Sequence, residues 1–153
     1  MAAKFREVRI INVYAPSGTA INQEREHFFN SELPYLVTGE TGHILLGGNL
    51  NCILEASDTT GGFTFSRALA ELVHGLALIV TSQGNPTSKV YTHYSASGAT
   101  RIHRIYATRE LLERKLRVDT IVAPFTDHFA LCLRILTYQL CGGDAGYGKC
   151  TAL

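Results

Sequence analysis

Asp127 and His128 are neighbours in the sequence, and a second histidine, His103, lies upstream of them. Side chains of these types can bind a divalent metal ion, hold a phosphate or move a proton. One hypothesis is therefore a two-histidine, one-carboxylate site for iron, manganese or zinc, although no helix or strand spacing fixes its geometry. A serine or cysteine hydrolase is not indicated, because the sequence has no Gly-x-Ser-x-Gly motif and Cys52 has no evident base beside it.

Short blocks with polar or aromatic residues at fixed places recur along the chain. They are Ile11-Asn12-Val13-Tyr14-Ala15-Pro16-Ser17, Gly47-Gly48-Asn49-Leu50-Asn51, Ser66-Arg67-Ala68-Leu69, Tyr91-Thr92-His93-Tyr94-Ser95, Thr100-Arg101-Ile102-His103-Arg104-Ile105 and Thr126-Asp127-His128-Phe129-Ala130. Their order and spacing resemble the endonuclease/exonuclease/phosphatase superfamily. Within that superfamily the chain is most similar to the apurinic-type endonuclease domains of non-LTR (LINE-type) retrotransposons.

The resemblance implies magnesium-dependent cleavage of a DNA phosphodiester. In this family Mg²⁺ offsets charge on the phosphate, one aspartate prepares the attacking water, and a histidine oriented by a second aspartate holds the phosphoryl oxygen. Carried over, His128 is that histidine and Asp127 is its neighbour near the metal. Asn51 matches the asparagine that positions the phosphate, and Tyr14 matches a tyrosine that lines the site.

Two positions depart from the family pattern. Asn49 replaces the water-activating aspartate, and His103 replaces the carboxylate that orients His128. An amide cannot accept a proton from water, and losing one positioned acid or base commonly costs about 10²- to 10⁴-fold in rate. Only eleven residues precede Asn12, whereas the family's domain starts earlier and there supplies the glutamate that is the principal magnesium ligand. We therefore expect an N-terminally truncated, degenerate domain that is inactive.

The formal net charge is +1 over 153 residues, which excludes binding of nucleic acid by a bulk positive field. Any DNA contact must be local, and it is expected to be weak or lost. The alternative function is a non-catalytic module that holds DNA backbone or a protein partner through Arg101, Arg104, Tyr91 and Thr92. A third hypothesis is that the product has no selected role.

Apolar spacing and turn residues predict sheets covered by helices, an α/β (α+β) fold. The predicted elements are strands 8–13 and 44–46, a helix 23–36 ended or kinked at Pro34, a helix 67–75 capped by Ser66, hairpin strands 90–94 and 101–106, a helix 109–115 capped by Thr108, and strands 118–122 and 129–135. The resemblance adds a partial four-layer sandwich of two packed, mainly antiparallel sheets with helices outside.

The domain is expected to span 1–135, followed by an irregular tail at 136–153. Read in a shifted register, the tail from Cys141 onward resembles the segment that follows this domain in such elements, so it is interpreted as out of frame. Missing strands would leave a sheet edge that a partner chain could cover. The chain shows no signal peptide and no membrane span, which favours a nuclear or cytoplasmic protein with reduced cysteines and no structural zinc.

Overall fold

A computed structural model of the 153-residue chain describes residues 8–18, 22–38, 42–81, 90–113, 116–122, 124–135 and 151–152. Its central sheet contains β1 (Val8–Tyr14), β2 (His43–Asn49), β6 (His103–Ala107) and β3 (Ile79–Val80) in the order β1-β2-β6-β3. The β1–β2 pair is parallel and the other pairs are antiparallel. This confirms a mixed α/β fold.

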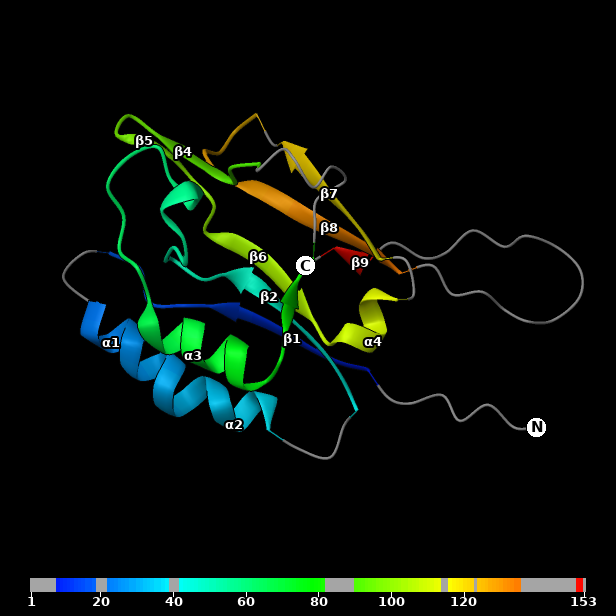
Figure 1. Ribbon diagram of the computed structural model, residues 1–153. Coiled ribbons are helices and arrows are strands. Elements are labelled where there is room, and N and C mark those ends of the chain that lie inside the picture. Colours follow the sequence, from blue (N-terminus) through cyan, green and yellow to red (C-terminus); the bar gives the residue numbers. More distant parts are fainter. Residues whose placement is uncertain are drawn as a thin grey trace, which may run out of the picture.

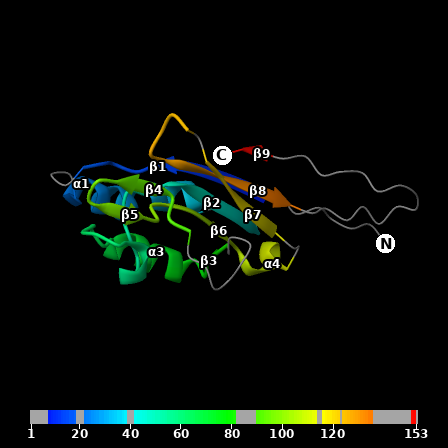
Figure 2. The ribbon, with the colours of Figure 1, turned by 90° about the horizontal axis from the view of Figure 1, so that it is seen from above.

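Two smaller sheets complete the strand framework (Figure 1). One is the hairpin of β4 (His93–Ser95) and β5 (Gly98–Thr100), and the other contains β7 (Leu116–Val122), β8 (Phe129–Ile135) and β9 (Thr151–Ala152). Helices α1 and α2, within residues 22–37, and α3 (Arg67–Gly75) lie along one side of the central sheet, and the β7–β8 sheet lies along the other (Figure 1 and, from above, Figure 2). The described residues thus supply one helix layer and two packed sheets of the expected four layers.

Strand β2 is buried on both faces because it lies between two hydrophobic cores. Ile44 and Leu46 pack with the helices, whereas Leu45 packs with Ile105 and the β7–β8 sheet. This alternation is what a strand covered on both sides requires. Strand β1 is the edge of the central sheet among the described residues, so a partner strand there stays a prediction.

The predicted helix at 23–36 forms, but Pro34 does not end it. The segment runs through α1 (Asn22–His27), a π-helical turn (Phe28–Glu32) and α2 (Leu33–Val37). Pro34 falls in the first turn of α2, where its missing N–H is not needed. The buried face is Phe29, Leu33 and Val37, while the apolar residue Leu36 is 51% exposed.

Helix α3 (Arg67–Gly75) begins and ends where the sequence predicts. Ser66 is its N-cap, and its buried hydroxyl oxygen accepts a hydrogen bond from the N–H of Leu69 at 3.2 Å. Leu69, Leu72 and Val73 face the helix-side core, as the apolar stripe predicts. The helix therefore holds its apolar face against the sheet.

We expect Ser66→Ala to lower the free energy of unfolding by about 1–2 kcal/mol, because Leu69 N–H would lose its acceptor in a buried place. Chemical denaturation measures the change. Ser31→Ala is the control, since Ser31 makes an exposed hydrogen bond to His27 and caps no helix; its effect should stay within about 0.5 kcal/mol. Equal stabilities of the two variants would contradict the capping role.

The hairpin and the fourth helix differ from their predicted bounds. The turn at Ala96-Ser97 joins β4 to β5, and β6 belongs to the central sheet instead of the hairpin. Helix α4 (Arg109–Leu112) is shorter than predicted, and Thr108 caps it without a side-chain hydrogen bond. Strand β3 was not predicted. In the tail, Thr151–Ala152 pairs with β8, while residues 136–150 lie outside the described part.

None of the helices in the described residues is both long enough and apolar enough to cross a membrane.

Candidate functional site at the end of the central sheet

Three of the predicted site residues lie at one level across three neighbouring strands. Tyr14 at the end of β1 pairs with Asn49 at the end of β2, and Asn49 pairs with His103 at the start of β6. The sheet register therefore brings Asn49 and His103, the two residues that depart from the family pattern, into adjacent positions.

Gly48 makes this register possible. Its φ is +132°, and a Cβ built there would lie 2.0 Å from the carbonyl oxygen of Val13 on β1. Only glycine combines that backbone angle with so close an approach of two strands. The glycine pair before Asn49 is thus explained by strand packing.

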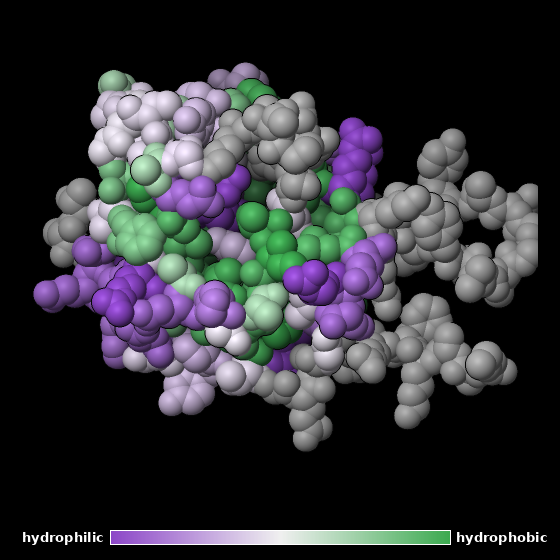
Figure 3. Space-filling view, viewed as in Figure 1, coloured by the Kyte–Doolittle hydropathy of each residue, from purple (hydrophilic) through white to green (hydrophobic). Residues whose placement is uncertain are grey.

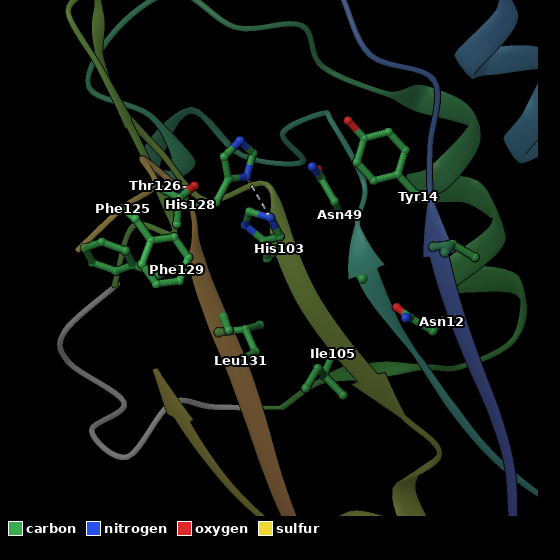
Figure 4. Close-up of a pocket in the computed structure, with 13 residues that line it drawn as sticks. Asn12, Tyr14, Asn49, His103, Ile105, Phe125, Thr126, His128, Phe129 and Leu131 are labelled. Carbon is green, nitrogen blue, oxygen red and sulfur yellow. Dashed lines mark hydrogen bonds between the residues drawn. The ribbon is translucent and has the colours of Figure 1, made fainter. Parts of the chain in front are cut away.

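A cavity of about 620 Å³ opens between this end of the central sheet and β8 (Figure 4). Figure 3 shows apolar surface in the middle of the face drawn in Figure 1, where these strands lie. The cavity wall combines polar and apolar side chains. It is formed by Asn12, Val13, Tyr14, Gly48, Asn49, His103, Ile105, Phe125, Thr126, His128, Phe129, Ala130 and Leu131. Tyr14 is 72% exposed and stands at the rim instead of deep in the site.

His128, His103 and Thr92 form a hydrogen-bonded chain into the protein. Nδ1 of His128 lies 3.1 Å from Nε2 of His103, and Nδ1 of His103 lies 2.8 Å from Oγ1 of Thr92. His103 does contact His128, as the resemblance implies for this position. Thr92, which we predicted to be a nucleic-acid contact, is fully buried and orients His103.

The chain admits two arrangements of protons on the imidazoles. Thr92 Oγ1 accepts from the backbone N–H of His103, and its own hydrogen can be donated to Nδ1 of that ring, in which case His103 donates from Nε2 to His128 and the proton of His128 lies on its Nε2. In the other arrangement each ring carries its proton on Nδ1 and donates along the chain toward Thr92. Burial, followed by charge on His128 and His93, lowers the pKa of His103 to about 4. A neutral imidazole thus replaces the anionic carboxylate that the family places beside this histidine.

Asp127 lies outside the cavity wall and faces a histidine that we did not predict. Its carboxylate is 3.4 Å from Nε2 of His93 and 3.7 Å from Nε2 of His128. The predicted set of Asp127, His128 and His103 is therefore corrected: His103 is behind His128, and His93 takes its place. The signal for His93 in the sequence was its place in the Tyr91-to-Ser95 block; in the structure it pairs with His128, just before the start of β8.

Asn51 does not line the cavity. It has a positive φ of 49°, its side-chain amide donates to the Ala15 carbonyl at 2.6 Å, and its backbone N–H donates to Oδ1 of Asn49 at 3.1 Å. These contacts tie the end of β2 to the end of β1. In this structure Asn51 positions Asn49.

Arg101 and Arg104 are not presented to a ligand, contrary to the DNA-binding hypothesis. Arg104 is 2% exposed, and its guanidinium donates to Oδ2 of Asp58 at 2.6 Å and to the Cys52 carbonyl at 3.1 Å. Nε of Arg101 lies 3.1 Å from Oδ1 of the same carboxylate. Both cations neutralise one buried aspartate. Tyr91, the remaining predicted contact, is half-buried.

Cys52 has no nucleophilic role in this arrangement. It is buried among apolar side chains, and this burial raises the pKa of its thiol to about 12 despite the nearby Arg104. The reactive thiolate is therefore essentially absent at neutral pH. Cys132 is also buried, whereas Cys141 and Cys150 lie outside the described residues.

The cavity does not fit a magnesium ion. Mg²⁺ prefers oxygen ligands and is usually held by one or two carboxylates. The described residues of the wall include amide, phenol and hydroxyl oxygens, but neither an aspartate nor a glutamate.

The fold is that of an apurinic (AP) endonuclease. The structure of an AP endonuclease from Archaeoglobus fulgidus superposes with a TM-score of 0.60 at 19% sequence identity, covering 81% of this chain and 60% of that one. No family model matches the sequence.

A curated relative narrows the class. The Transposon TX1 uncharacterized 149 kDa protein of Xenopus laevis is 30% identical over 139 residues, which covers 85% of this chain and 10% of the relative. The chain therefore spans about a tenth of that protein's length. It is an endonuclease/exonuclease/phosphatase-like domain of a LINE-type retrotransposon.

Proposed function

We propose that this domain derives from a magnesium-dependent DNA endonuclease and no longer cleaves phosphodiesters. The observation that carries the proposal is the pairing of Asn49 with His103 at the cavity. The resemblance assigns a carboxylate to each of these positions. An amide and a neutral imidazole stand there, so the cavity lacks a carboxylate base at position 49 and an anion at Nδ1 of His128; the carboxylate of Asp127 lies on the Nε2 side of that ring, at 3.7 Å.

Asn49 cannot replace the base by an indirect route. Its Oδ1 accepts the N–H of Asn51, which leaves the Nδ2 amide to face a ligand. An amide nitrogen donates hydrogen bonds and accepts none. A water placed at Asn49 could be oriented, but it would keep its proton.

His128 retains part of its expected role. With the proton on Nε2 it can still donate a hydrogen bond to a phosphoryl oxygen. The carboxylate that the resemblance places beside Nδ1 is replaced by His103, so the charge-assisted form of that bond is weakened. Each of the two replacements, Asn49 and His103, is expected to lower the cleavage rate by about 10²- to 10⁴-fold. The two factors need not multiply, because the effects of residues that act as one unit are not additive.

We expect the natural chain to nick supercoiled plasmid in Mg²⁺ or Mn²⁺ no faster than its His128→Ala variant. The measurement is the rate of conversion of supercoiled to open-circular DNA, with folding of each variant checked by circular dichroism. Nicking by the natural chain that His128→Ala abolishes would overturn the proposal, since the site would then tolerate both replacements.

The double reversion Asn49→Asp, His103→Asp separates two explanations of inactivity. If the reverted protein nicks, these two replacements account for the loss. If the reverted protein is folded and still does not nick DNA, the cause of inactivity lies elsewhere in the metal-binding part of the site. DNA binding through Arg101 and Arg104 is not favoured in either case, because both guanidiniums are committed to Asp58.

A further inference from the structure

We propose that His93, Asp127 and His128 form a binding site for a divalent transition-metal ion of the zinc type at the rim of the cavity. One ligand atom from each residue lies within 4.8 Å of the other two. The carboxylate stands between the two Nε2 atoms, at 3.4 Å from His93 and 3.7 Å from His128. The inference rests on these contacts and does not depend on the loss of cleavage.

The three ligands are held by a short stretch of backbone pairing between residues 92–94, at the start of β4, and residues 127–129, at the start of β8. His93 forms a β-bridge with His128. On either side of the bridge, Tyr94 N–H donates to the Asp127 carbonyl at 3.0 Å and Phe129 N–H donates to the Thr92 carbonyl at 2.8 Å. Because backbone bonds fix both segments, the site is assembled before any ion arrives.

Each histidine has a partner for the ring nitrogen that would not bind the metal. Nδ1 of His93 lies 3.2 Å from Oγ1 of Thr100, and Nδ1 of His128 lies 3.1 Å from Nε2 of His103. Metal-binding histidines in proteins are almost always oriented by such outer contacts. Both Nε2 atoms therefore point toward Asp127.

Metal binding at Nε2 of His128 requires its proton to lie on Nδ1. The chain to Thr92 allows this, since His128 can donate to Nε2 of His103, and His103 can donate from Nδ1 to Oγ1 of Thr92. In this arrangement both imidazoles stay neutral with one proton each, on Nδ1; the proton of Nε2 of His128 is exchanged with solvent, and the Thr92 hydroxyl hydrogen no longer has His103 as its acceptor. His103, which replaces a family carboxylate, thereby becomes a positioning residue for a metal ligand.

The chemical types of the three ligand atoms determine which metal ion the site prefers. Two imidazole nitrogens and one carboxylate oxygen suit Zn²⁺ and neighbouring transition metals, whereas Mg²⁺ prefers oxygen alone. The side chains of Asp127 and His128 are 60% and 39% exposed, so an ion can enter and Asp127 can rotate to close the ligand distances. Three protein ligands leave coordination positions open to water.

Calorimetric titration of the metal-free full chain with Zn²⁺ in excess Mg²⁺ tests the site. We expect one ion per chain, with affinity reduced at least tenfold in Asp127→Asn, an exposed position that does not threaten folding, and in His93→Gln. His103→Gln should weaken binding by about 10- to 100-fold without removing a ligand. His74→Gln, exposed at the end of α3, is the matched control and should bind like the natural chain.

Co²⁺ in place of Zn²⁺ distinguishes this site from one built on cysteines. We expect its spectrum to lack the intense near-ultraviolet charge-transfer band of thiolate ligands. Absence of Zn²⁺ binding, equal affinity in Asp127→Asn and the natural chain, or a thiolate band in the cobalt spectrum would each overturn the proposal.

Discussion

Removing the buried carboxylate of Asp58 is expected to lower the free energy of unfolding by about 3–5 kcal/mol in the Asp58→Ala variant. Asp58 is fully buried, and it accepts from Arg104 at 2.6 Å and from the N–H groups of Leu54 and Glu55 at 3.1 and 3.0 Å. Its loss leaves the Arg104 guanidinium charged inside the protein without an anion. Urea denaturation of both proteins measures the difference.

Asp119→Ala is the control, because Asp119 also contacts two arginines but lies on the partly exposed strand β7. Its carboxylate is 2.9 Å from Arg117 and 3.3 Å from Arg134, with a quarter of the side chain exposed. Surface pairs contribute about 0–1 kcal/mol. A cost for Asp58→Ala as small as that for Asp119→Ala would contradict the structural role of the buried cluster.

The stabilisation by Asp58 should also depend on pH in one direction. Burial alone would raise the pKa of Asp58, but Arg104, the Leu54 N–H and Arg101 outweigh it, so the pKa lies below its ordinary value. A depressed carboxyl pKa stabilises the fold above the pKa of the unfolded chain, near 4, and this contribution is lost as pH falls through the folded pKa. The stabilities of the natural protein and Asp58→Asn should therefore converge in acid.

Gly48→Ala is expected to prevent stable folding of the central sheet. An alanine at φ +132° carries backbone strain of about 1–3 kcal/mol, and its Cβ would meet the Val13 carbonyl at 2.0 Å. Backbone atoms on a paired strand cannot rotate away, so β1 must separate from β2 or the register must shift. Thermal unfolding followed by circular dichroism should show a strongly lowered or absent transition.

Gly62→Ala is the matched control for that experiment. A Cβ at Gly62 has no neighbour within 4 Å, and the residue lies in an exposed loop. Its effect should stay within about 0.5 kcal/mol. A Gly48→Ala protein that unfolds like the Gly62→Ala protein would show that the strands can separate without loss of stability.

Local patterns in the sequence predicted much of the fold because they act within one element. Ser66 and the apolar residues after it predicted both ends of α3, and the strands predicted at 118–122 and 129–135 correspond to β7 and β8. The helix before β2 was predicted as a unit, and Phe29 and Leu33 of its apolar spacing are buried, but Leu36 is exposed and Val37 takes its place in the core. A π-helical turn changes which residues face the core beyond Phe28, and spacing rules assume a constant period.

The candidate site was predicted only where a family motif names the residue. His128, His103, Asn49 and Tyr14 do meet at one cavity. The DNA-contact role predicted for Arg101 and Arg104 does not agree with the structure. A sequence does not reveal that a charged residue has a buried counter-ion more than forty residues away, as Arg104 has in Asp58. His93 was missed for a similar reason, since its neighbour Asp127 belongs to another sheet.

The order of strands in the central sheet limits the rate at which this site can fold. β2 pairs on one side with residues 8–14 and on the other with residues 103–107. Such distant pairings must close long loops before any contact offsets the lost chain entropy, which makes folding slow. During synthesis on a ribosome, the wall of the cavity cannot be completed until β8 has emerged, so the face of β2 that carries Leu45 stays uncovered until then.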